Sequence, residues 1–118
     1  MTINRNGINC PGFEAALQFV TAQYPWMLVD LDSISLLPQQ EMLGAFGLYH
    51  PVFRTVRIST AHDTVLDFID TLVHELIHHI QYTTNALHGH EELEREANNY
   101  AYLAVKEYKT IKGIPLWK

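Results

Sequence analysis

The sequence is poor in cysteine and in basic residues. Its 118 residues include a single cysteine, Cys10, which cannot form a disulfide within the chain. A chain without disulfides is typical of a reducing compartment. The chain has only eight lysines and arginines but 13 aspartates and glutamates, which gives a formal net charge of −5. Contacts to phosphates require clusters of basic side chains, so the composition argues against a nucleic-acid-binding surface.

Long apolar segments are also lacking. The first residues, MTINRNGINCPGF, are polar and contain no apolar core of a secretory signal. No apolar run approaches the length of a membrane span. We therefore expect a soluble, cytoplasmic protein, in the host cytoplasm if a virus encodes it. With 47% hydrophobic residues, the chain is long enough to bury one core, and we expect a single domain over residues 1–118.

The hydrophobic pattern predicts an α+β domain. Apolar residues recur at helical spacing in three segments and follow strand-like patterns between the first and the second of them. The expected order is a helix over 13–23, strands over 26–37, 42–49 and 52–59, a helix from Asp63 or Thr64 to about Asn85, and a helix over 91–109. This order favours helices packed on one face of a small sheet of about three strands.

Histidine is the unusual residue of this composition. Five of the seven histidines lie between His74 and His90, and two of them belong to the segment His74-Glu75-Leu76-Ile77-His78. This is an H-E-x-x-H motif within the strongest predicted helix. Side chains four residues apart lie on one face of a helix, with Cβ atoms roughly 5–6 Å apart, so both imidazoles can reach one metal ion.

The spacing of the motif also suggests a chemical role for Glu75. This residue is rotated by about 100° from His74 around the helix axis, beside the metal rather than on it. Zinc held in this way acidifies a bound water and polarises a substrate carbonyl. Glu75 would act as the general base that takes the proton of the water and returns it to the leaving amine. The motif therefore predicts a zinc-dependent peptidase.

A catalytic zinc site requires a third protein ligand and an open fourth position. The last predicted helix offers Glu91, Glu92, Glu94 and Glu96. Glu96 falls on the apolar stripe of Leu93, Ala97, Tyr100, Ala101 and Ala104, where an unpaired carboxylate is costly to bury. The sequence therefore favours Glu96 as the third ligand, with Glu92 as the alternative one turn earlier. The other acidic residues suit a solvated helix N-terminus.

These segments resemble a known family. The motif His74–His78, followed by Glu96-Ala97-Asn98-Asn99-Tyr100-Ala101, is similar to the gluzincin metallopeptidases, in particular to ImmA/IrrE-type and SprT-like domains. The similarity covers about residues 54–104. It implies a zincin-like fold, a zinc ion bound by His74, His78 and Glu96, and peptide hydrolysis with Glu75 as the base.

The sequence departs from this family in its supporting residues. Thermolysin-type gluzincins have an aspartate four residues after the glutamate ligand, where this chain has Tyr100. Orientation of the first histidine then falls to Asn99, Tyr100 or Asp70. Tyr100, His88 or His90 could stabilise the oxyanion. The zinc-ribbon cysteines of SprT-like proteases and a helix-turn-helix are lacking, so neither DNA repair nor repressor cleavage is implied.

Two questions of function stay open at the level of sequence. The strand over 52–59 could pair with an extended peptide substrate or be an ordinary strand of the sheet. The domain as a whole could be a metal-containing module that binds a protein partner without cleaving it. An intact Glu75 favours the enzyme, because a structural metal site needs no base there. The sequence does not indicate the oligomeric state.

Overall fold

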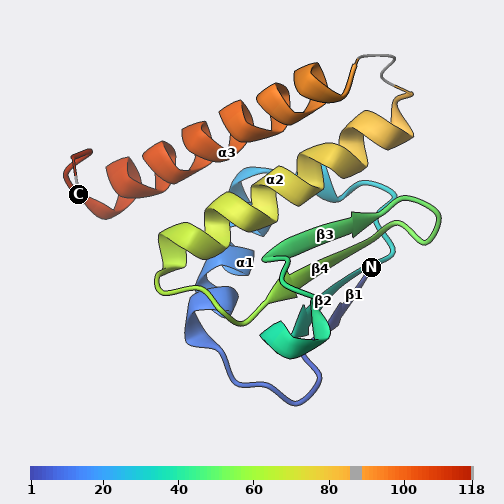
Figure 1. Cartoon of the computed structure of the whole chain (residues 1–118). Helices are drawn as coiled ribbons and strands as arrows, with labels where there is room; N and C mark the ends of the chain where they lie inside the picture. The colour runs from blue at the N-terminus through green and yellow to red at the C-terminus, as the bar shows by residue number, and fades with distance from the viewer. Residues whose placement is uncertain (86–88, 118) are drawn as a thin grey trace.

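The computed structural model describes residues 1–85 and 89–117. These residues form a four-stranded sheet and three α-helices (Figure 1). The strands are β1 (Thr2–Asn4), β2 (Ser33–Leu37), β3 (Gly47–His50) and β4 (Thr55–Ser59), in the order β1-β2-β4-β3. The first three in this order are parallel, and β3 pairs with β4 in the antiparallel direction. Strand β3 is therefore an edge strand that runs against the others.

The predicted α+β arrangement, with helices on one face of the sheet, is confirmed. Helix α1 (Pro11–Gln23) starts with proline in its first turn and ends before Pro25, as the stereochemistry of proline favours. Helix α2 (Val65–Thr83) is capped by Thr64, whose hydroxyl accepts a hydrogen bond from the backbone N–H of Asp67. Both helices lie on the same side of the sheet (Figure 1).

The core lies between these two helices and the sheet. The buried side chains of α2 recur every three or four residues and meet alternate side chains of β2 and β4. The fully or almost fully buried residues in this layer include Phe13, Val20, Ile34, Leu36, Val56, Ile58, Ile69, Leu72, Val73 and Leu76. Helix α2 is therefore held on its apolar side, which fixes the direction of its remaining side chains.

Helix α3 (His90–Lys112) packs along α2 on the side away from the sheet (Figure 1). Its buried residues are Ala97, Ala101 and Ala104. Small side chains at this spacing allow two helices to approach closely. The helix ends at Gly113, whose left-handed conformation (φ 71°) is common after a helix C-terminus. None of the helices in the described part of the chain is long and apolar enough to cross a membrane.

The structure differs from the sequence prediction in the strands. The predicted strand over 26–37 is a 3-10 helix, η1 (Pro25–Leu28), followed by a turn and the shorter β2. The predicted strand over 42–49 begins only at Gly47, after a second 3-10 helix, η2 (Gln39–Glu41), and a turn. Strand β1 was not predicted, because three mostly exposed residues show no apolar alternation. The predicted strand over 52–59 starts at Thr55 and lies inside the sheet.

Candidate metal centre

The two histidines of the motif converge as their spacing predicts. His74 and His78 lie one turn apart on the face of α2 that the core leaves free, and their side chains are 20% exposed. Their Nε2 atoms are 3.1 Å apart. Both imidazoles therefore direct the same ring nitrogen toward one point.

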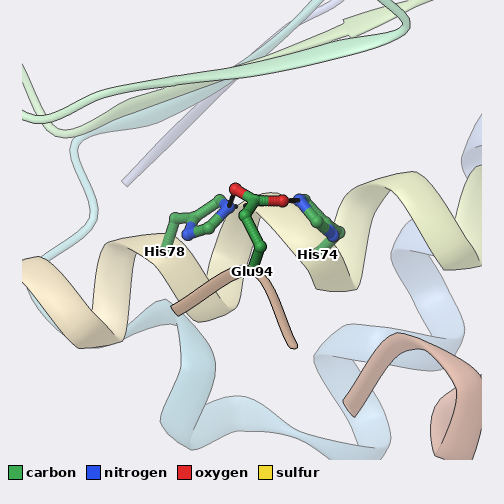
Figure 2. Close-up of side chains that lie close together, drawn as sticks. All are labelled: His74, His78 and Glu94. Carbon is green, nitrogen blue, oxygen red and sulfur yellow. Dashed lines mark hydrogen bonds and ion pairs between the residues drawn. The ribbon is translucent and has the colours of Figure 1, made fainter. Parts of the chain in front are cut away.

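The third group at this point is the carboxylate of Glu94, from the second turn of α3. Its Oε2 lies 3.2 Å from Nε2 of His74 and its Oε1 lies 2.9 Å from Nε2 of His78. Figure 2 shows the carboxylate reaching across to both imidazoles. All three side chains are half-buried, and their ligand atoms lie within 4.8 Å of one another. Two imidazoles and one carboxylate match the donors that zinc prefers, so this group could hold a metal ion.

The structure does not bring Glu96 to the histidines, contrary to the sequence prediction. Glu96 is exposed, and its Oε1 accepts a hydrogen bond from Nε2 of Gln81 at 2.9 Å. The predicted inward stripe contained Leu93 and Tyr100 as well as the alanines, and this wider stripe caused the difference. Tyr100 is 41% exposed, whereas the buried stripe consists of Ala97, Ala101 and Ala104.

The geometry of α3 explains why Glu94 takes this place. At about 100° per residue, Glu94 lies about 20° from Ala101 around the helix axis, whereas Glu96 lies about 140° away. Glu94 therefore continues the alanine stripe toward the N-terminus of the helix, where α3 faces His74 and His78. The predicted stripe included these alanines, but Leu93 and Tyr100 shifted its centre around the helix toward Glu96.

Glu75 lies beside this cluster and also faces strand β3. Its carboxyl group is half-buried between α2 and the sheet edge, and desolvation raises its pKa to about 7. The charge of His78 opposes this shift, and the charge of Glu94 adds to it. A pKa near neutral pH suits a general base, and this carboxyl group lies next to the possible metal ligands.

The approach of β3 to α2 requires a glycine at position 47. A methyl group on Gly47 would lie 2.5 Å from Cγ2 of Thr71 and 3.2 Å from Oε2 of Glu75. The first distance is a steric overlap, so a side chain here must displace Thr71 or push the strand and the helix apart. Gly47 therefore allows the sheet edge to lie next to the Glu75 carboxylate.

This close contact leads to a testable prediction. Gly47→Ala should lower the free energy of unfolding by about 1–3 kcal/mol, the usual range for overpacking, as measured by urea denaturation. Because most of the overlap is with Cγ2 of Thr71, Thr71→Ser should recover part of this loss while keeping the hydroxyl that contacts Nε2 of His62. A double variant no more stable than Gly47→Ala alone would show that Thr71 is not the obstacle.

A cleft of about 490 Å³ lies over the cluster. Its walls come from β3 and the turn after it, from α2, and from the first two turns of α3, including His74, Glu75, His78, Glu94 and His90. Gly47, Leu48, Tyr49, Pro51, Tyr82 and Leu93 add a largely apolar lining. The three possible metal ligands and Glu75 therefore share one cavity, whose volume lies within the usual range of ligand-binding pockets.

The predicted supporting residues are distributed differently. His90 lines the cleft, whereas Tyr100 lines another cavity and packs against Trp26 with ring centroids 5.9 Å apart. Asn99 is exposed on α3. Desolvation raises the pKa of the Asp70 carboxyl group. The charge of His74, which lies nearby, opposes this shift. His88 lies outside the described residues.

Comparison with known proteins assigns the chain to no family. No family model matches the chain, and no curated protein or solved structure is significantly similar to it.

The neighbouring His79 has a structural role in the core and lies outside the cluster of His74, His78 and Glu94. It is fully buried, its Nε2 lies 2.7 Å from the carbonyl of Val29, and its Nδ1 lies 2.8 Å from the hydroxyl of Tyr49. The carbonyl can only accept, so Nε2 carries the proton and Nδ1 accepts from Tyr49. This link ties β3 and the segment after η1 to the C-terminal part of α2.

Several residues of the site were not predicted. Tyr82 lies four residues after His78, on the same face of α2, and this spacing could have indicated it. Gln81 lies three residues after His78 and accepts from Nδ1 of that histidine at 2.8 Å. Gly47 and Tyr49 carry no sequence signal of this kind, because only the pairing of β3 with β4 brings them to the cleft.

Proposed function

We propose that the protein is a zinc-dependent peptidase of the gluzincin type with a zincin-like fold, and that peptides or proteins are its substrates. The observation that carries the proposal is the shared cleft, in which Glu75 lies next to a His74, His78 and Glu94 group at the edge of a sheet. Three protein ligands with an open side are typical of catalytic rather than structural zinc sites.

The residues of the chain divide the chemistry between them. A metal ion bound by the three ligands would polarise the scissile carbonyl and acidify a water. Glu75 takes one proton from the attacking water, whose oxygen bonds to the carbonyl carbon. As the carbon–nitrogen bond breaks, Glu75 gives this proton to the leaving amine. His90 and Tyr82 line the cleft and carry the side-chain donors that could reach the substrate oxyanion.

Strand β3 supports binding of an extended peptide. The backbone N–H of Ser59 donates to the carbonyl of Phe46 at 2.9 Å, and Gly47 pairs with Ile58. Because hydrogen-bonded residues alternate along an antiparallel pair, the backbone groups of Gly47 and Tyr49 point away from β4. They lie on the free edge next to the cleft, where a substrate strand could pair with them. The edge is thus β3 and not the segment 52–59.

The first test is metal content and its link to activity. Protein purified without added metal should contain about one zinc per chain, and a chelator should abolish cleavage of a peptide library. Added zinc should restore both occupancy and cleavage. Protein that neither contains zinc nor takes it up in titration would contradict the proposal. Zinc-loaded protein that binds peptides without cleaving them would favour the alternative, a metal-containing binding module.

A further inference from the structure

Gln81 occupies a position from which it contacts both helices of the metal centre. It is 5% exposed, although it is a polar residue on the C-terminal part of α2. Its amide nitrogen donates to the backbone carbonyl of Leu93 and to Oε1 of Glu96, each at 2.9 Å. Its amide oxygen lies 2.8 Å from Nδ1 of His78.

The partners of Gln81 determine which way its amide faces. The carbonyl of Leu93 can only accept a hydrogen bond, so the NH₂ group must point toward α3. The oxygen is then left facing His78 and can only accept. Nδ1 of His78 must therefore carry the proton of this hydrogen bond, which leaves Nε2 as the nitrogen for a metal ion.

The same side chain also positions the carboxylate ligand. Leu93, whose carbonyl accepts from Gln81, directly precedes Glu94 in the first turns of α3. Gln81 thus connects the ring of one proposed ligand to the backbone next to another. Glu96 accepts the second N–H of the amide, so that both amide protons have acceptors.

We propose that Gln81, supported by Glu96, is the positioning residue of the metal centre. It holds His78 with Nε2 toward the metal and fixes α3 so that Glu94 reaches the same point. The inference rests on the proposed metal site but not on the proposed hydrolysis. It also gives Glu96 a role, as a hydrogen-bond acceptor behind the site rather than as a ligand.

The test compares zinc affinities by chelator competition. Gln81→Met keeps the length of the side chain but removes both hydrogen-bonding groups, and it should weaken zinc binding by about 10–100-fold. Gln18→Met, at an exposed position of α1, is the matched control and should bind zinc like the parent. Glu96→Ala should weaken binding by less than about tenfold, because the bonds to Leu93 and His78 persist.

Two further measurements separate positioning from a general loss of stability. In zinc-loaded parent protein, the Nδ1–H of His78 should exchange slowly with water in ¹H–¹⁵N spectra, and Gln81→Met should speed this exchange. The double variant Gln81→Glu with Glu96→Gln reverses the donor and the acceptor between these two positions, and its new carboxylate can still accept from His78. It should recover part of the zinc affinity that Gln81→Met loses.

The outcomes distinguish this inference from the proposed function. Zinc binding by Gln81→Met within twofold of the parent would overturn the inference, whatever the change in unfolding free energy. If the parent itself binds no zinc, the proposed metal site fails, and the positioning role fails with it. If the parent binds zinc but cleaves nothing, only the peptidase proposal is affected. The zinc affinities of the parent and Gln81→Met still test whether Gln81 positions the metal ligands.

Discussion

Glu75→Gln is expected to reduce peptide hydrolysis by at least about a hundredfold while zinc stays bound, because general acid–base catalysis contributes at least this much. The amide has nearly the same shape as the carboxyl group but cannot accept a proton from water. The loss should therefore appear in kcat, with little change in KM. Steady-state kinetics on a cleavable peptide, together with the zinc content of each preparation, would measure it.

The environment of Glu75 makes this variant a clean test. Desolvation already raises the pKa of this group to about 7, so a neutral amide adds no new cost of burying a charge. The fold should be retained. Glu41→Gln, an identical change at an exposed position of η2 that does not line the cleft, should leave the kinetics unchanged.

Two results would contradict the assignment of Glu75 as the base. Activity equal to that of the parent would show that another group accepts the proton. Loss of zinc together with activity would show that Glu75 supports the metal centre instead of acting on the substrate. The second result is distinguishable from unfolding by the circular dichroism of the metal-free variant.

The sequence predicted those parts of the site that one helix determines. His74, Glu75 and His78 belong to α2, whose length and apolar face define its rotation, so helical geometry places the three side chains relative to one another. The same regularity predicted all three α-helices to within a few residues at each end. Local periodicity was sufficient because no distant contact was needed.

The sequence did not determine what depends on contacts between elements. The approach of α3 to α2 is set by Ala97, Ala101 and Ala104, and small residues contribute little to an apolar pattern. Larger neighbours such as Tyr100, which is 41% exposed, suggested a different face. The pairing of the strands could not be predicted either, because β3 becomes the edge beside the cleft only through its register with β4.

The choice between Glu94 and Glu96 has the largest expected effect on metal binding. Glu94→Ala removes the carboxylate that lies 3.2 Å and 2.9 Å from the Nε2 atoms of His74 and His78. Loss of a direct ligand should cost more than loss of a residue that merely orients one, so the zinc affinity should fall by more than about a hundredfold. Competition with a zinc chelator at constant pH and ionic strength would measure the change.

Matched variants on the same helix complete this experiment. Glu91→Ala removes the same charge from an exposed position in the first turn of α3 and should change zinc affinity little, which controls for the general electrostatic field. Glu96→Ala should have an intermediate effect of less than about tenfold, since it acts only through Gln81.

The opposite result would contradict the packing of α3. If Glu96→Ala loses the metal and Glu94→Ala keeps it, α3 must rotate by about 160° from the structure described, at about 100° per residue. Ala97, Ala101 and Ala104 would then leave the interface with α2, and a helix face of Tyr100 and Leu103 would have to replace them. The contrast between the two glutamates therefore tests the packing of α3 and the composition of the metal centre at the same time.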